Sequence, residues 1–212
     1  MVWYSFVVDA GIYLVQLFLD WLKTIFVVPF QTSDMLWLLV PVWIAWFFSE
    51  FFQEKMGTSM GNAISNAVVI LWGSIDCTRQ TAFWMAKGVL TRVDILSRFA
   101  FIGMMFAYGA FILYMGIKGK EVIRYIGRVR QVTYIFIMFV PIFYRAIPFT
   151  WNHIIAAIIF FPIFYFIIEL IDRYTPDPQA LKLDMRKTER PAQSAPLGLP
   201  QQNFNQYNQI RR

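Results

Sequence analysis

Apolar residues fill most of the first 171 positions in long runs that charged residues interrupt only briefly. Residues 99–117, FAFIGMMFAYGAFILYMGI, contain no charged side chain. At about 1.5 Å per residue, a helix of this length matches a hydrocarbon core about 30 Å thick. We therefore expect this segment to cross a membrane as a helix.

The same pattern predicts further helices, whose limits follow from prolines and polar residues. Pro29 ends the first apolar run, and Asp34 is expected to cap the next helix. Pro148 and Asn152 separate the last two runs, which predicts an antiparallel hairpin that either crosses the membrane twice, as we favour, or re-enters it. The full set of expected spans is 3–28, 35–52, 60–78, 99–117, 132–151 and 153–171.

The chain changes character at residue 172. Residues 172–212 are rich in Pro, Gln, Asn and charge, and such a segment has too little apolar surface to fold alone. We expect a transmembrane helical domain over 1–171, followed by a disordered cytoplasmic tail over 172–212. The predicted fold class is all-α, a polytopic transmembrane helix bundle of five or six spans. Segment 60–78 is expected to cross with its polar face inward, the alternative being an amphipathic helix on the membrane surface.

Composition supports a lipid environment and excludes several kinds of site. The chain is 58% hydrophobic and 15% charged, whereas soluble domains average about 45–50% and about 25%. The first cation is Lys23, so no secretory signal peptide is expected. Cys77 and His153 are single residues of their kinds, so we expect no disulfide, no metal site built on thiolates or imidazoles, and no cofactor.

Lysine and arginine gather in segment 118–130 and in the tail. The positive-inside rule places both on the cytoplasmic side, although the basic residues of segment 79–98 oppose that orientation. Segment 118–130 is also amphipathic, so it is expected either to lie on an anionic leaflet or to be a solvated loop that sets topology. Its candidate contacts to lipid headgroups are Lys118, Lys120, Arg124, Arg128 and Arg130.

Polar residues recur at helical spacing in the first and third predicted helices. An ionised side chain in lipid costs about 2.5–3.5 kcal/mol, so each polar row must face protein or water. We expect the two rows to face each other, with Arg79 or Lys87 close to Asp9 or Asp20. The resulting seam is either dry structural packing or a water-filled path. Its residues are Asp9, Gln16, Asp20, Lys23, Asn62, Asn66, Asp76, Arg79 and Gln80.

No catalytic, nucleotide-binding or metal-binding motif is present in the sequence. Thr58 or Ser59 is expected to cap a helix. We expect a multi-pass integral membrane protein that acts as a non-enzymatic subunit or scaffold of a larger membrane assembly. The alternative is a small channel or transporter lined by the 62–80 helix face. The expected partners are the lipid bilayer, other membrane-protein subunits and a cytoplasmic protein docked by the tail, with no nucleic acid.

Overall fold

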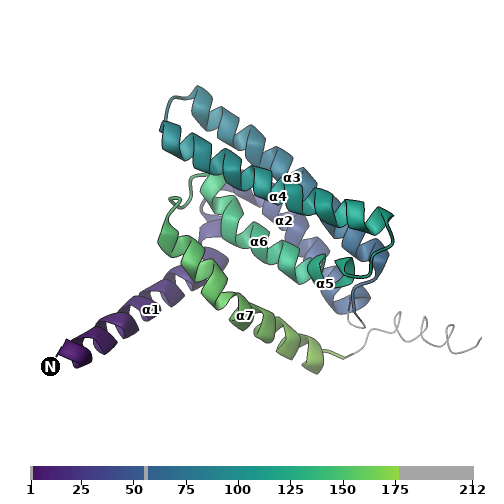
Figure 1. Ribbon diagram of the computed structural model, residues 1–212, viewed down its shortest axis with the longest axis horizontal. Coiled ribbons are helices and arrows are strands. Elements are labelled where there is room, and N and C mark those ends of the chain that lie inside the picture. Colours follow the sequence, from purple (N-terminus) through teal and green to yellow (C-terminus); the bar gives the residue numbers. More distant parts are fainter. Residues whose placement is uncertain (1, 55–56, 177–212) are drawn as a thin grey trace, which may run out of the picture. The chain divides into compact units, whose positions relative to one another are not determined.

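The computed structural model describes residues 2–54 and 57–176, and every regular element in them is helical. The all-α fold class is therefore confirmed, while residues 177–212 of the expected disordered tail lie outside the described residues. The elements are α1 (Val2–Phe26), η1 (Val28–Phe30), α2 (Ser33–Phe48), η2 (Ser49–Gln53), α3 (Met60–Ala86), α4 (Arg92–Ile117), α5 (Ile123–Ile126), α6 (Val129–Phe143) and α7 (Trp151–Tyr174) (Figure 1).

Three helical segments of the described chain are long and apolar enough to cross a membrane. They are Ser33–Gln53, which joins α2 to η2, Arg92–Ile117 of α4 and Trp151–Tyr174 of α7. Only 28–33% of each apolar window is buried within the protein. Their remaining apolar surface is suited to lipid, so the chain has the properties expected of a membrane protein.

Residues 79–98 contain the end of one helix and the start of the next. α3 continues through residue 78 to Ala86, and α4 already begins at Arg92. Thr91 caps α4 through a reciprocal capping box with Asp94, and Gly88 turns the chain with a φ of 67°. Hydropathy did not predict these helix ends, because the charged residues of this segment are compatible with a helix whose end lies outside the lipid.

Other helix limits also depart from the expected ones. Asp34 was expected to cap the second helix, which is wrong, because α2 begins at Ser33 and its N-cap residue Thr32 makes no side-chain capping bond. Ser59 caps α3 by accepting a bond from the Asn62 amide, as expected. The helix expected over 132–151 ends at Phe143.

The last helix also outruns its expected end. α7 continues to Tyr174, and Asp172 is buried. The tail therefore does not start at residue 172, as the change of composition suggested. Composition marks where apolar residues become rare, and a helix can continue past that point with mostly exposed residues, as α7 does up to Tyr174.

α6 is the most enclosed helix of the described chain. Of its 15 residues 12 are buried, and it contacts α1, α2, α3 and α7. α3 and α4 lie side by side in opposite directions (Figure 1). Gly109 of α4 leaves room for Leu71 of α3, and Gly116 for Ile64, so the two backbones approach closely.

α1 packs on α6 and α7 mainly through its C-terminal half, and the Tyr13 hydroxyl also donates to Asn152 Oδ1 of α7 at 3.0 Å. Within residues 6–26, Leu17, Trp21 and Thr24 are buried. The Trp21 indole donates to the Tyr134 hydroxyl at 2.9 Å, and that hydroxyl donates to the Ala157 carbonyl at 2.6 Å. Residues 6–16 include no buried position, and this half of α1 extends beyond the neighbouring helices (Figure 1).

Candidate functional site

Polar side chains gather at both ends of the helix bundle. At the first end, here the η2 end, η2 meets the starts of α3 and α6 and the last turns of α7. At the second, here the 144–150 end, loop 144–150 meets the C-terminal part of α3 and the first turns of α4 and α7. The η2 end holds the most deeply buried charges, so it is the candidate functional site.

Arg130 is the centre of the η2 end. Its guanidinium pairs with Glu50 through Nη2 and with Glu169 through Nη1, the latter at 2.6 Å. The Arg130 side chain is 7% exposed and that of Glu50 1%, whereas that of Glu169 is 58% exposed. The guanidinium carbon also lies 4.5 Å from the centre of the Tyr165 ring. Glu50 belongs to the π-helical segment η2, a geometry often found at functional sites.

Glu54 extends this cluster to α3 and to the start of α6. Its carboxylate accepts bonds from Thr58 Oγ1 at 2.7 Å, Asn66 Nδ2 at 3.0 Å and the Val129 amide at 3.2 Å. Asn66 also donates to the Gly127 carbonyl at 2.8 Å. The end of η2, the start of α3 and the start of α6 are thereby fastened together. We call Glu50, Glu54, Asn66, Arg130 and Glu169 the acidic network.

The acidic network is suited to holding helices together. Its polar atoms are largely occupied by one another, although Glu50 Oε2 is buried without a partner. The described residues contain no group of three or more His, Cys, Asp or Glu placed to hold a metal ion. Cys77 is buried in the apolar core, and His153 Nε2 is bonded to the Met138 carbonyl at 2.7 Å. Neither group faces the acidic network.

The α3 side of the predicted seam is divided between the two ends. Asn66 belongs to the acidic network and Asn62 lies half-buried in the first turn of α3. Gln80 is buried near the 144–150 end, where it lines a hollow with Tyr144. Asn66 and Gln80 are about 21 Å apart along the helix axis. Apolar packing fills the space between them.

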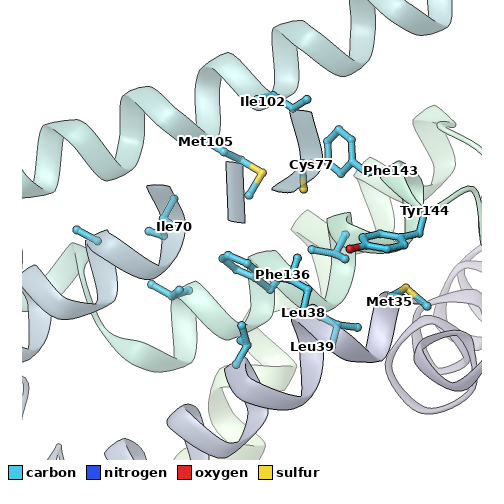
Figure 2. Packing of buried hydrophobic residues seen from close by; sticks show 14 of the residues in the cluster. Met35, Leu38, Leu39, Ile70, Cys77, Ile102, Met105, Phe136, Phe143 and Tyr144 are labelled. Carbon is cyan, nitrogen blue, oxygen red and sulfur yellow. The ribbon is translucent and has the colours of Figure 1, made fainter. Parts of the chain in front are cut away.

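Phe136 provides that packing. Its ring occupies the space in which a Cβ at Gly73 would lie, midway between Asn66 and Gln80. Phe136 and Ile70 are both fully buried. Figure 2 shows the Phe136 ring among Ile70 of α3, Met105 of α4 and Leu38 of α2. The polar face of α3 is therefore interrupted by an apolar layer.

Arg79 does not reach the first helix. Its guanidinium bonds Asp76 of its own helix at 2.9 and 2.8 Å, and Tyr144 donates to the same carboxylate at 2.5 Å. The expected pairing of Arg79 with Asp9 or Asp20 is therefore wrong. Tyr144 lies outside the three candidate spans, and burial together with the bond to Asp76 raises the pKa of its phenol. A phenol is protonated at neutral pH, which agrees with its role as the donor to Asp76.

The polar row of α1 has other surroundings than the α3 row. Its residues Asp9, Gln16, Asp20 and Lys23 are exposed. Asp20 and Lys23 line a hollow at the 144–150 end together with Asn152. α1 packs against α7 and α6, whereas the main neighbours of α3 are α4, α6 and α5. Lys87, the other expected partner, has its ammonium 4.1 Å from the centre of the Phe83 ring.

The basic segment also divides into two groups. Arg130 is buried in the acidic network, and Arg128 donates to the Tyr165 hydroxyl. The expectation that Arg130 contacts lipid headgroups is therefore wrong, while Lys118, Lys120 and Arg124 are exposed. Glu50 and Glu169 interrupt apolar runs in the sequence. Acids in such positions require partners, and that signal could have indicated Arg130.

Comparisons of the chain with protein-family models, with curated proteins and with solved structures gave no match.

Proposed function

We propose that this chain is a multi-pass integral membrane protein that acts as a non-enzymatic subunit or scaffold of a larger membrane assembly. The observation that carries the proposal is the apolar surface on the N-terminal half of α1. Phe6, Val7, Leu14 and Val15 are 67, 65, 48 and 59% exposed. A helix half that leaves its own bundle with such a surface is suited to packing against another membrane protein.

The distribution of residues around α1 supports this role. Leu17 and Trp21 face the bundle, and the polar row with Asp9 and Gln16 follows a second side of the helix. Val7 and Leu14 precede Trp21 by 14 and 7 residues, so at 100° per residue they continue its side of the helix beyond the bundle, opposite the polar row. Val15 lies about 120° from Trp21, on a third side. A partner helix can therefore pack on these apolar sides while the polar row faces water or polar groups of the same assembly.

The apolar layer in α3 weighs against the alternative, a channel or transporter along the 62–80 face. A continuous path needs polar or small side chains along its whole length. The Phe136 ring fills the space beside Gly73, between Asn66 and Gln80. The polar residues at each end are thus better suited to fixing helix ends than to lining a pore.

We further propose that the chain crosses the membrane five or six times, with the C-terminus in the cytoplasm. α2 with η2, α3, α4, α6 and α7 alternate between the two ends of the bundle, which gives five crossings. α6 spans about 22 Å, less than a hydrocarbon core, but its neighbours shield its ends. α1 is then either a sixth span or an interfacial helix. This alternation puts the 118–128 loop and the tail on one side, as the positive-inside rule favours.

Site-specific photo-crosslinking tests the subunit role. A benzophenone side chain is introduced at Val15 of α1 and, as the matched control, at Met104 of α4, which is 61% exposed against 59% for Val15. We expect irradiation of intact membranes to join Val15 to one protein, and Met104 to lipid alone. The same adduct must form when the captured protein, rather than this chain, carries the affinity tag. Equal adducts from both positions, or lipid adducts alone, would contradict the proposal.

Flux measurements in liposomes test the alternative. We expect purified protein to produce no ion flux above that of empty liposomes. A flux whose selectivity changes in Asp76→Asn would favour the channel and contradict the subunit role. Removing residues 177–212 tests the tail separately, because this truncation leaves α7 and buried Asp172 intact. We expect it to release a cytoplasmic partner while crosslinking from Val15 persists.

A further inference from the structure

A groove between α4, α6 and α7 has the properties of a lipid-binding site. Its volume is about 360 Å³, within the size range of small-molecule sites. Tyr108 comes from α4, Ile135 and Phe139 from α6, and Ile158 and Phe161 from α7. We propose that this groove binds one acyl chain of an anionic phospholipid, whose headgroup lies at the η2 end. The site does not depend on the subunit role proposed above.

The position of the groove gives an acyl chain access from the bilayer. Two of its three walls, α4 and α7, are candidate spans, and Ile158 is 68% exposed. Lipid tails are about as apolar as the side chains that line the groove, so the groove alone distinguishes one lipid from another only by shape. Chemical selection must then come from polar groups at one end.

Gln131 is such a group. It lines the groove from the first turns of α6, and its Oε1 is buried without a hydrogen-bond partner. The other polar groups are satisfied, because Tyr108 donates to the Ile126 carbonyl and Tyr134 donates to the Ala157 carbonyl. A buried amide that lacks a partner is unfavourable. An ester carbonyl of a phospholipid can accept a bond from Nε2, and a hydroxyl of a phosphatidylglycerol headgroup can donate to Oε1.

Arginines flank the same end of the groove. Arg124 and Arg128 lie two residues before and after Ile126, which lines the groove. Arg124 is exposed, and the Nε of Arg128 is buried without a partner. Arg128 also donates to the Tyr165 hydroxyl, whose ring contacts Phe161 of the groove at 6.1 Å between centroids. Glu121 is the one acid in segment 118–130, and the exposed Glu169 of the same end is paired with Arg130, so this segment favours an anionic headgroup.

Native mass spectrometry of the full chain tests the proposal. The protein is released from micelles that contain equimolar dioleoyl-phosphatidylglycerol and dioleoyl-phosphatidylcholine. We expect one retained phosphatidylglycerol, in at least about threefold preference over phosphatidylcholine. Gln131→Leu, which removes the amide at similar volume, should weaken retention about threefold to tenfold, the effect of one hydrogen bond. Arg124→Gln should reduce the preference for the anionic lipid without changing total lipid retention.

Matched substitutions on α7 separate the groove from the general lipid surface. Ile158→Trp fills the groove, and we expect it to abolish retention of both lipids. Ile167→Trp changes an exposed residue of the same helix that does not line the groove, so retention should equal that of the unmodified protein. Helical circular dichroism and a single elution peak confirm folding of every variant. Glycerophosphoglycerol, the headgroup without acyl chains, should not displace the lipid.

Several results would overturn the proposal. Equal retention of the two lipids by the unmodified protein would show that the site does not select an anionic headgroup. Unchanged lipid retention in both Gln131→Leu and Ile158→Trp would show that the lipid does not bind in the groove. Displacement of the lipid by glycerophosphoglycerol at equal concentration would show that the acyl chain contributes nothing.

Discussion

Replacement of Arg130 by methionine tests whether the acidic network stabilises the bundle. The Glu50 side chain is 1% exposed, so its carboxylate would lose its partner without being solvated by water. Removing one member of a buried ion pair costs about 3–5 kcal/mol. The Glu169 side chain is 58% exposed, so water can replace its contact with Arg130. We therefore expect Arg130→Met to destabilise by about 3–5 kcal/mol and Glu169→Gln by at most about 1 kcal/mol.

The free energy of unfolding can be measured by titrating purified protein in a mild detergent with dodecyl sulfate and following helical circular dichroism. The double variant Glu50→Met/Arg130→Met replaces the pair by apolar groups of similar volume. Such replacements are often nearly neutral, so the double variant should be more stable than Arg130→Met alone. This ordering follows from an unpaired buried carboxylate and not from loss of packing.

Two results would refute the reasoning. If Arg130→Met and Glu169→Gln destabilise equally, the burial of Glu50 has no energetic consequence. If the double variant is no more stable than Arg130→Met, the loss of stability comes from the missing guanidinium and not from an unpaired Glu50 carboxylate.

Three further predictions concern packing and helix caps. Gly73→Ala should destabilise by about 1–3 kcal/mol, because its Cβ meets the Phe136 ring, whereas Gly103→Ala meets no atom within 4 Å and should be neutral or slightly stabilising by the same titration. Phe136→Ala should cost about 3–5 kcal/mol, and a cost below 1 kcal/mol would mean that the apolar layer is loosely packed. Thr91→Ala should lower stability by about 1 kcal/mol through loss of the α4 cap, while Asp34→Ala, which removes no capping bond, should leave the denaturation midpoint unchanged.

Much of the fold could be predicted from the sequence because long apolar runs have the length of a helix that crosses a bilayer. The uncharged run 99–117 lies within α4, and the runs at 35–52 and 153–171 lie within the other two candidate spans. Ends of helices were harder to predict, because the charged residues near Ala86 and Arg92 remain helical. Local patterns describe the environment of a segment better than its exact limits.

The polar contacts could not be predicted from the pattern of one helix. Periodicity placed Asn66 and Gln80 on one face of α3, and both are buried. Periodicity carried no information about which helix covers that face. α6 covers it through Phe136, whereas α1 was expected there. Long-range pairing depends on the complementarity of whole surfaces, which a single sequence does not display.

In the proposed five-span or six-span topology, the partners of Arg130 constrain the order in which the helices enter the membrane. Glu50 precedes Arg130 by 80 residues and Glu169 follows it by 39. When α6 leaves the ribosome, Glu50 has already been synthesised and can pair with the Arg130 guanidinium, whereas Glu169 has not. In the proposed topology, an α6 segment that enters lipid before η2 is in place carries an uncompensated arginine, so we expect α6 to be held at the insertion machinery until the first helices have assembled.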